Sequence, residues 1–271
     1  LGNVTGNGKI YVEGGNLPGG TYTEFTDCSG NGTIEYGGNG TYIIVSGVYS
    51  SVPNLIFSGT GRRILPNSDL TVCKRLVIDG PILDNSVNNR KITVQGTFER
   101  YNSGAFRAGA GAYPAATVSF SGSAPQTLGG ATGDFSGTDR FWNVEINNPA
   151  GLTISDGSLI EAGNQLKLTN GVINTSAAGR LVLLSASPSA VTPVGGSSVS
   201  YVSGPLTKQI INGDSFVFPL GKGPVMGHRF TLTSAAGVTA SFTAEFFSPN
   251  TTATSIAPPL EVTNTLEYWN V

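Results

Sequence analysis

Three carboxylates in the first third of the chain have a spacing that could support acid–base chemistry. Asp69, Asp79 and Asp84 lie among short strand-like segments, and strand-rich enzymes that act on polysaccharides use clustered Asp and Glu for proton transfer or for binding Ca²⁺. Each of the three, however, falls at a turn, where Asp commonly accepts hydrogen bonds from its own backbone. We therefore interpret them as turn residues and not as a catalytic cluster.

The single histidine limits the other kinds of catalysis. His228 is the only one in the chain, so Ser-His-Asp catalysis, Cys-His catalysis and histidine-rich metal sites would all depend on it. It stands beside Arg229, just before a strand, which is typical of a surface or capping residue. The Gly-rich segment 37–40 does not open a helix and lacks the Lys-Ser/Thr of a phosphate loop. The sequence predicts no catalytic residue, no metal and no cofactor.

Two cysteines, Cys28 and Cys73, are too few for a zinc site of four thiolates and lack a CxxC spacing. A disulfide between them would need an oxidising compartment and Cα atoms closer than about 7 Å. It would close a loop of 45 positions, for which the chain-entropy model gives about 4 kcal/mol. Two buried thiols in a strand-rich core are the alternative, and the sequence leaves both open.

Aromatic side chains in polar surroundings could stack on sugar rings. The candidates are Tyr49, Tyr101, Phe106, Tyr113 and Trp142. The alternative is that they fill the core or pack against turns, and the sequence favours this second interpretation.

The elements that must position these residues are built from an unusual composition. Charged residues make up 12% of the 271 residues, 39% are hydrophobic, and there are 38 glycines. This mixture disfavours helices and suits short strands with tight turns. The net charge of −2 and the lack of a basic stripe argue against nucleic acid as a partner. The apolar runs fall far short of the ~20 residues that span a bilayer, so we expect no membrane span.

Short strands follow one another closely along the first two-thirds of the chain. Examples are 33–36, 42–45 and 54–57, and 9–13 and 21–26 also alternate as strands do. Between Leu70 and Asn102, small apolar clusters recur every six to ten residues with turn residues between them. The segment 102–112 is expected to be a loop. Such spacing is too short for long hairpins and fits an all-β fold, a parallel β-helix-like β-solenoid.

Self-comparison suggests a long repeat within the region 1–187. Ile34 aligns with Val118 at an offset of 84, and Leu76 aligns with Leu166 at an offset of 90. The drift places small insertions in loops, for example at 129–137. We interpret the pattern as two degenerate units, 32–115 and 116–187.

The C-terminal third has a different character. The segment 188–198 contains two prolines and Gly195-Gly196, which is typical of a linker. The segment 239–247 alternates as a full-length strand, and we expect 199–271 to form a β-sandwich. The end of the chain at 267–271 reads as the middle of a strand, and the start, Leu1-Gly2, shows no signal peptide. We expect a mature or fragmentary chain whose natural form continues.

The segment 204–232 carries a resemblance to a known family. Its three motifs are Gly204-Pro205-Leu206-Thr207-Lys208, Phe216-Val217-Phe218-Pro219-Leu220-Gly221-Lys222 and Arg229-Phe230-Thr231-Leu232. They resemble a segment common in large surface proteins of Bacteroidota, and the similarity extends over nearly the whole chain. It departs at 224–227, where Pro-Val-Met-Gly replaces a short polar turn. The resemblance implies export by the type IX secretion system and a relation to gliding-motility adhesins. The family provides no catalytic residues to transfer.

Together these observations predict a non-enzymatic structural or adhesive segment of a large extracellular or cell-surface protein. The expected partners are further domains of the same longer chain, surface polysaccharide and other cell-surface proteins. One alternative is a carbohydrate-binding or polysaccharide-cleaving β-helix. Another is a subunit of an extracellular filament or assembly, suggested by the open edges of a solenoid.

Overall fold

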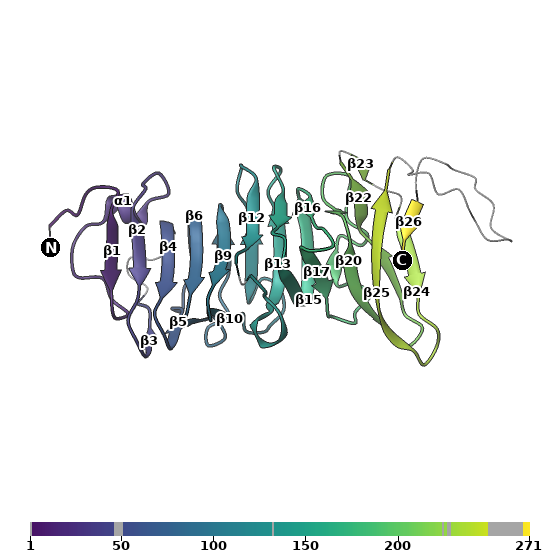
Figure 1. Cartoon of the computed structure of the whole chain (residues 1–271), viewed down its shortest axis with the longest axis horizontal. Helices are drawn as coiled ribbons and strands as arrows, with labels where there is room; N and C mark the ends of the chain where they lie inside the picture. The colour runs from purple at the N-terminus through teal and green to yellow at the C-terminus, as the bar shows by residue number, and fades with distance from the viewer. Residues whose placement is uncertain (1, 46–50, 132, 224, 227–228, 249–267) are drawn as a thin grey trace.

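The protein is an elongated rod of coiled β-structure. The computed structural model describes residues 2–45, 51–131, 133–223, 225–226, 229–248 and 268–271. Strands account for 50% of the described residues and helices for 3%, and the strands form a β-solenoid of about nine turns. Figure 1 shows the strands side by side along the rod, with the two termini toward opposite ends. The prediction of an all-β solenoid is confirmed.

Three parallel stacks of strands build the rod, and each coil passes through them in the same order. The first stack contains β1 (Lys9–Val12), β2 (Thr33–Tyr36), the second halves of β4 (Ser51–Ser58) and β6 (Leu70–Asp79), β9 (Thr97–Tyr101), β12 (Gln126–Gly129), β14 (Leu152–Ile154), β16 (Ile173–Asn174), β19 (Val202–Ser203) and β22 (Leu220–Lys222).

The second stack contains the first halves of β4 and β6, then β8 (Ile92–Val94), β11 (Thr117–Phe120), β13 (Phe141–Asn147), the second half of β15 (Leu159–Asn170) and β18 (Val191–Thr192). The third contains β3 (Thr41–Ile43), β5 (Arg62–Ile64), β7 (Ile82–Asp84) and β10 (Ala105–Arg107), and continues in the first half of β15, β17 (Arg180–Leu183) and β20 (Leu206–Ile211).

The repeating unit is a single coil, and the two long units 32–115 and 116–187 do not describe the stacking. Following the register of the first stack, Ile34 leads to Leu55, Leu76, Phe98 and then Leu128. Val118, which the sequence alignment matched to Ile34, lies in the second stack, in line with Ile92. The offset of 84 therefore compared strands on two different faces. Both faces carry the same inward apolar alternation, so the pattern alone could not separate them.

A column of glycines explains why one kind of turn recurs. Gly38, Gly59 and Gly80 follow one another at one-coil spacing, and all three have positive φ (76°, 82° and 107°). A Cβ atom on Gly59 would lie 2.0 Å from the Gly38 carbonyl oxygen, and one on Gly80 would lie 2.4 Å from that of Gly59. Only glycine allows the turns of successive coils to stack this closely.

The core holds a fully buried cation at one of these turns. The side chain of Arg63 in β5 is 0% exposed. Its Nη1 and Nη2 atoms donate to five backbone carbonyls at 2.8–2.9 Å, and its guanidinium lies 4.4 Å from the ring centroid of Tyr42. The carbonyls belong to the segments 37–40 and 58–60, which are the turns of two adjacent coils. Arg63 therefore gives the carbonyls of these turns hydrogen bonds beyond those from the backbone N–H groups of Thr60 and Arg62, which donate to Gly38 and Gly40.

The segment 21–26, expected as a strand, contains a short helix, α1 (Thr23–Thr26). Tyr22 and Phe25 are both buried, and their spacing of three places them on the same side of one helical turn. The apparent alternation in the sequence was therefore misleading here, because both apolar side chains point toward the core from the same side.

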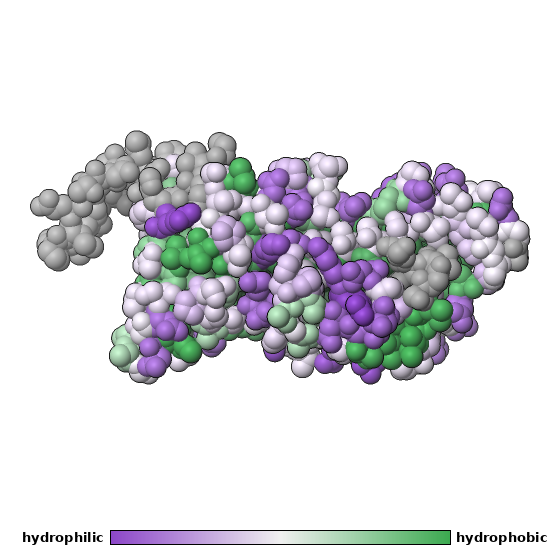
Figure 2. Space-filling view, turned by 180° about the vertical axis from the view of Figure 1, so that it is seen from behind, coloured by the Kyte–Doolittle hydropathy of each residue, from purple (hydrophilic) through white to green (hydrophobic). Residues whose placement is uncertain are grey.

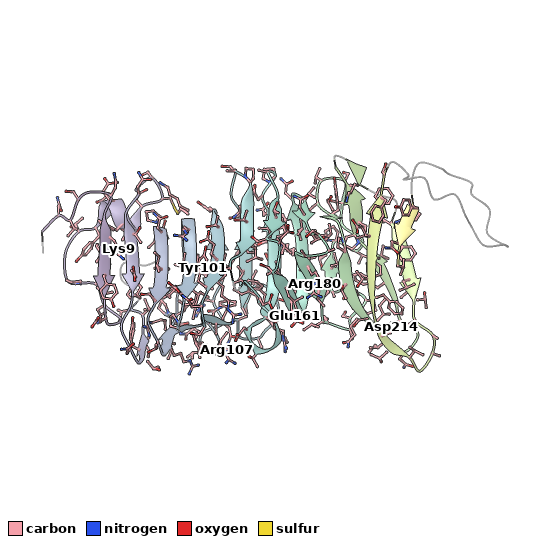
Figure 3. The ribbon with its side chains drawn as sticks, viewed as in Figure 1. Lys9, Tyr101, Arg107, Glu161, Arg180 and Asp214 are labelled. Atoms are coloured by element: carbon pink, nitrogen blue, oxygen red, sulfur yellow. A yellow bond between two sulfur atoms is a disulfide. The ribbon has the colours of Figure 1, made fainter. Side chains whose placement is uncertain are left out.

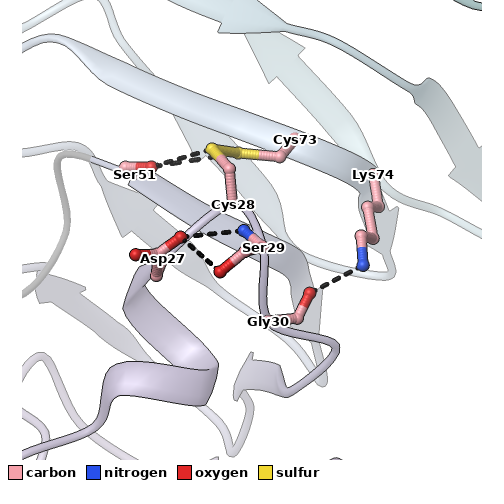
Figure 4. Close-up of a disulfide and its surroundings, with 7 residues drawn as sticks. All are labelled: Asp27, Cys28, Ser29, Gly30, Ser51, Cys73 and Lys74. Atoms are coloured by element: carbon pink, nitrogen blue, oxygen red, sulfur yellow. Dashed lines mark hydrogen bonds between the residues drawn. A yellow bond between two sulfur atoms is a disulfide. The ribbon is translucent and has the colours of Figure 1, made fainter.

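A disulfide fastens the segment after α1 to the stack. Cys28 is bonded to Cys73 of β6, with Cα atoms 5.4 Å apart. The Lys74 ammonium donates to the Gly30 carbonyl at 2.7 Å, and Asp27 accepts hydrogen bonds from the backbone N–H and hydroxyl of Ser29 (Figure 4). Of the two alternatives left open by the sequence, the structure contains the bonded pair.

The parallel stacking does not end at the expected linker 188–198. That segment contains β18, which pairs with β15, and further on β20 pairs with β17 and β22 with β19. The expected boundary is therefore too early, because prolines and glycines also form the turns between stacked strands.

The β-sandwich expected over 199–271 is not confirmed. Beyond β20, β22 keeps its parallel partner β19, and the other described pairings are antiparallel: β21 (Ser215–Phe218) pairs with β24 (Phe230–Thr233), β25 (Thr239–Phe247) with β20 and β26 (Tyr268–Asn270), and β23 (Val225–Met226) with β22. The strand predicted at 239–247 is confirmed. It lies along β20 and so covers an edge that the solenoid would otherwise leave open.

The junction between the parallel and antiparallel parts buries a second cation. Lys208 of β20 is 0% exposed. Its ammonium donates to the carbonyls of Ser185 and Gln209 and lies 5.0 Å from the ring centroid of Phe216. Burial lowers the pKa of Lys208 to about 8, and the charge of Asp214 offsets this only in part.

Because of Lys208, we expect the folded protein to become more stable as the pH rises into the alkaline range. An unfolded lysine titrates near 10.4, so between about pH 8 and pH 10 the unfolded chain binds more protons than the folded one, and the free energy of unfolding rises with pH. Denaturant titrations across this range are expected to show the rise in the wild type and to lose it in Lys208→Met. Lys222→Met, which removes a half-exposed lysine, serves as the matched control. Equal slopes for Lys208→Met and the wild type would contradict the assignment.

The surface mixes polar and apolar patches. Seen from behind, the rod carries hydrophilic side chains between separate small apolar patches (Figure 2). Among the residues that the structure describes, no helix has the length and apolar character needed to cross a membrane.

Candidate functional site

A polar cavity lies on the outer side of the third stack. Successive strands direct Arg62 (β5), Ile82 and Asp84 (β7) and Arg107 (β10) toward this side of the rod, with Asp84 buried beneath the arginines. The residues between them, such as Leu83 and Phe106, point into the core. The cavity has a volume of about 340 Å³ and is lined by these four residues and Ser86. Figure 3 labels Arg107 at the lower edge of the rod.

A second cavity of about 440 Å³ adjoins the first and shares Ser86 and Arg107 with it. Its other walls come from the segment 108–110 and from Thr138, Arg140 and Trp142. We call the two together the arginine groove, defined by Arg62, Asp84, Arg107, Arg140 and Trp142. The groove runs along the rod from β5 to the start of β13.

Trp142 is held in a fixed position in this groove. Its indole N–H donates to the Gly111 carbonyl at 2.8 Å. A Cβ atom on Gly163 of the next coil would lie 2.9 Å from Cε3 of the indole and 3.0 Å from Nε of Arg140. The absence of a side chain at Gly163 therefore lets both Trp142 and Arg140 lie close against the strand.

The exposed charge in the groove is positive. The Asp84 carboxylate is fully buried; it pairs with Arg62 and accepts hydrogen bonds from the N–H (2.7 Å) and hydroxyl (2.6 Å) of Ser86. The side chains of Arg62 and Arg107 are 40% and 39% exposed. Arg140 donates from Nη1 to the Gly137 carbonyl at 2.9 Å. The arginines thus keep donor atoms at the surface while the acidic group beneath them is already neutralised.

Comparisons of the chain with models of known protein families, with curated proteins and with solved structures find no match. The site therefore has to be judged from its own geometry. In the described part of the chain, no three His, Cys, Asp or Glu side chains gather where they could hold a metal ion.

The three carboxylates considered at the sequence level do not form a cluster. Asp84 accepts the N–H two residues along, as expected of a turn residue. Asp69 accepts the backbone N–H of Lys91 at 3.0 Å, and Asp79 accepts from the side chain of Asn102. Both of these contacts reach one coil further along the rod, so they fasten neighbouring coils. His228 lies outside the described residues.

Phe106 is not a surface aromatic. The segment 102–112, expected to be a loop, contains β10, which places Phe106 in the core at 0% exposure. There it packs against Phe98, Phe135 and Phe141, with ring centroids 5.3–6.3 Å apart. Its small-residue neighbours hid the strand, because Ala and Gly carry little strand signal.

The other candidate aromatics have different surroundings. Tyr101 donates its hydroxyl to Glu99 at 3.2 Å. Tyr113 donates to Glu145 at 3.2 Å, and the ammonium of Lys167 lies 4.2 Å from its ring centroid. Tyr49 lies outside the described residues. Trp142 alone among the four described candidates lines the arginine groove.

A buried carboxylate on the second stack holds the segment that contains Tyr113. Glu145 is 4% exposed and accepts hydrogen bonds from Lys91 (3.0 Å), Ser119 (2.9 Å), Thr169 (3.1 Å) and Tyr113. Burial would raise the pKa of Glu145, but the hydrogen bonds from Lys91, Ser119 and Lys167 and the charge of Lys91 outweigh it and lower the pKa to about 2. A carboxylate this acidic does not serve as a general acid near neutral pH.

Because of Glu145, we expect the folded protein to lose stability as the pH falls into the acidic range. Because its folded pKa lies below the unfolded value, its contribution is present above about pH 4.5 and is lost as pH falls toward 2. Chemical denaturation between these values is expected to show a steeper fall for the wild type than for Glu145→Gln. Glu13→Gln, at an exposed position, should behave as the wild type does. If Glu145→Gln and the wild type fall in parallel, the cluster does not stabilise the folded state.

The arginines were missed at the sequence level. A basic and an acidic residue one coil apart, such as Arg62 and Asp84, indicate a pair that joins two coils. This spacing can be recognised in the sequence only when the coil length is known. Arg140 and Trp142 show no such spacing. They lie on a longer coil of 26 residues, which contains the short 3₁₀-helix Gly137–Asp139.

Proposed function

We propose that this chain is a non-catalytic, structural and adhesive segment of a large extracellular or cell-surface protein. The β-solenoid is compatible with such a role, since stacked coils form a rod in which each coil contacts only its neighbours. In this function the rod acts as a stiff spacer, and its side surfaces contact other cell-surface material.

The observation that carries the proposal is the way charged residues fasten one coil to the next. Lys9 pairs with Glu35 (2.7 Å), Arg75 with Glu99 (2.6 Å), Lys167 with Glu145 (3.2 Å), and Arg62 with Asp84. Each pair joins strands that are neighbours in a stack. A single exposed ion pair contributes only about 0–1 kcal/mol. Several such ion pairs, together with the backbone hydrogen bonds between stacked strands, distribute an applied force along the rod.

Location outside the cell is supported by two features. A disulfide such as Cys28–Cys73 forms and persists in oxidising compartments. The motifs at 204–232 resemble surface proteins of Bacteroidota, which favours export by type IX secretion and a relation to gliding-motility adhesins. The other parts of such a protein would be further domains of the same chain.

The proposal is tested on the organism that produces the protein. Antibodies against the rod are expected to label intact cells, and in-frame deletion of the segment is expected to reduce the retention of cells on a polysaccharide-coated surface under flow. The purified chain is expected to release no reducing ends from polysaccharides. Unlabelled intact cells would contradict the location, unchanged retention would contradict the adhesive role, and released reducing ends would contradict the absence of catalysis.

A further inference from the structure

We propose that the arginine groove binds a carboxylated polysaccharide. The inference rests on the proposed adhesive function and names the class of ligand that the rod would hold. Arg62, Arg107 and Arg140 are the cationic groups, and Trp142 is the stacking platform.

The guanidinium groups fit a carboxylate. Arginine presents paired N–H donors in a planar fork that matches the two oxygens of a carboxylate. Asp84 is buried beneath the groove and already paired with Arg62, so it adds little repulsion. Two other acidic groups lie nearby: Asp139 is shared between Arg100 (3.1 Å) and Arg107 (3.5 Å), and Glu161 accepts the backbone N–H of Gly137 at 2.7 Å. Four arginines therefore face three carboxylates, which leaves an excess of positive charge.

The tryptophan fits a sugar ring. The face of an indole is the negative part of its quadrupole and attracts the C–H groups on the apolar side of a pyranose. Its hydrogen bond to Gly111 and the space above Gly163 fix the ring before a ligand arrives. A fixed platform loses little entropy on binding.

The shape of the groove favours a chain over a single sugar. Arg62, Arg107 and Arg140 stand on different coils, and neighbouring parallel strands are about 4.8 Å apart, which is comparable to the length of one sugar residue. The two joined cavities, of about 340 and 440 Å³, each fall within the usual range of about 300–1,000 Å³ for ligand sites. A linear polymer lying along the rod would present successive carboxylates to successive arginines.

The test measures binding of an oligogalacturonate to the purified chain by calorimetry. Its fully methyl-esterified form is the neutral control of the same shape, and monomeric galacturonate tests whether a free carboxylate suffices. Loss of the charge-assisted hydrogen bonds in the double variant Arg107→Gln, Arg140→Gln is expected to weaken binding by about tenfold or more. Arg180→Gln removes an exposed arginine that lies apart from Arg107 along the rod (Figure 3) and should bind as the wild type does. Thermal unfolding checks that every variant is folded.

Tryptophan emission gives an independent readout. The chain contains two tryptophans, so in Trp269→Phe the signal comes from Trp142 alone, and the oligogalacturonate is expected to change it. The proposal is overturned if the oligomer does not bind, if the ester or the monomer binds equally well, if Arg180→Gln loses as much affinity as the double variant, or if Trp142 emission does not change. Any of these results would leave cell-surface labelling and cell retention unaffected, so the failure of this inference is distinguishable from failure of the proposed function.

Discussion

Replacement of Arg63 by methionine is expected to lower the free energy of unfolding by about 3–5 kcal/mol, one of the largest effects of any single change in this chain. Methionine replaces the aliphatic part of the side chain but is shorter than arginine and offers no donor. Five carbonyls of the turns 37–40 and 58–60 would then be buried without their hydrogen bonds from Nη1 and Nη2. Urea denaturation followed by circular dichroism measures the loss.

Two further variants separate charge from geometry. Arg63→Lys keeps the cation but supplies three donors in place of five, so we expect an intermediate loss. Arg180→Met changes an exposed arginine and should alter stability by no more than about 0.5 kcal/mol. A loss for Arg63→Met as small as that for Arg180→Met would show that the turns do not depend on this guanidinium.

Removal of the disulfide is expected to cost about 4 kcal/mol, because it releases a loop of 45 residues in the unfolded chain. The bond also holds the segment that follows α1 against β6, so its loss should affect the N-terminal coils most. Denaturant midpoints with and without a reducing agent measure the effect, and hydrogen exchange locates it.

The double variant Cys28→Ser, Cys73→Ser is the matched control for this experiment. It should resemble the reduced wild type and should not respond to the reducing agent. A wild-type midpoint that is the same in both conditions would mean that the bond does not contribute to stability.

The sequence predicted the kind of fold well, because strand length is a local property. Short alternating segments, such as 33–36 and 54–57, and the long one at 239–247, correspond to β2, the second half of β4, and β25. Which strands stack on which could not be predicted. Ile34 and Val118 have the same environment in the sequence, yet they face the core from different stacks. The coil length varies from 18 to 30 residues, so no fixed period reveals the register.

The candidate site was less predictable than the fold. Trp142 was recognised as an aromatic that could stack on sugar, but Arg62, Arg107 and Arg140 were not singled out, since isolated arginines in a chain with few charges give no local pattern. Phe106 illustrates the opposite error. Its surroundings of Ala and Gly suggested an exposed loop, whereas the register of Phe106 with Leu83 places it in the core.

Stretching single molecules by handles at the two ends tests the central claim, that the chain is a load-bearing rod of stacked coils. With coils of 18 to 30 residues, we expect the rod to resist force and then to open in successive steps of about 6–11 nm, one coil at a time. The coils within the disulfide-closed loop 28–73 should lengthen fully only after reduction. Extension without steps at negligible force would contradict a load-bearing rod.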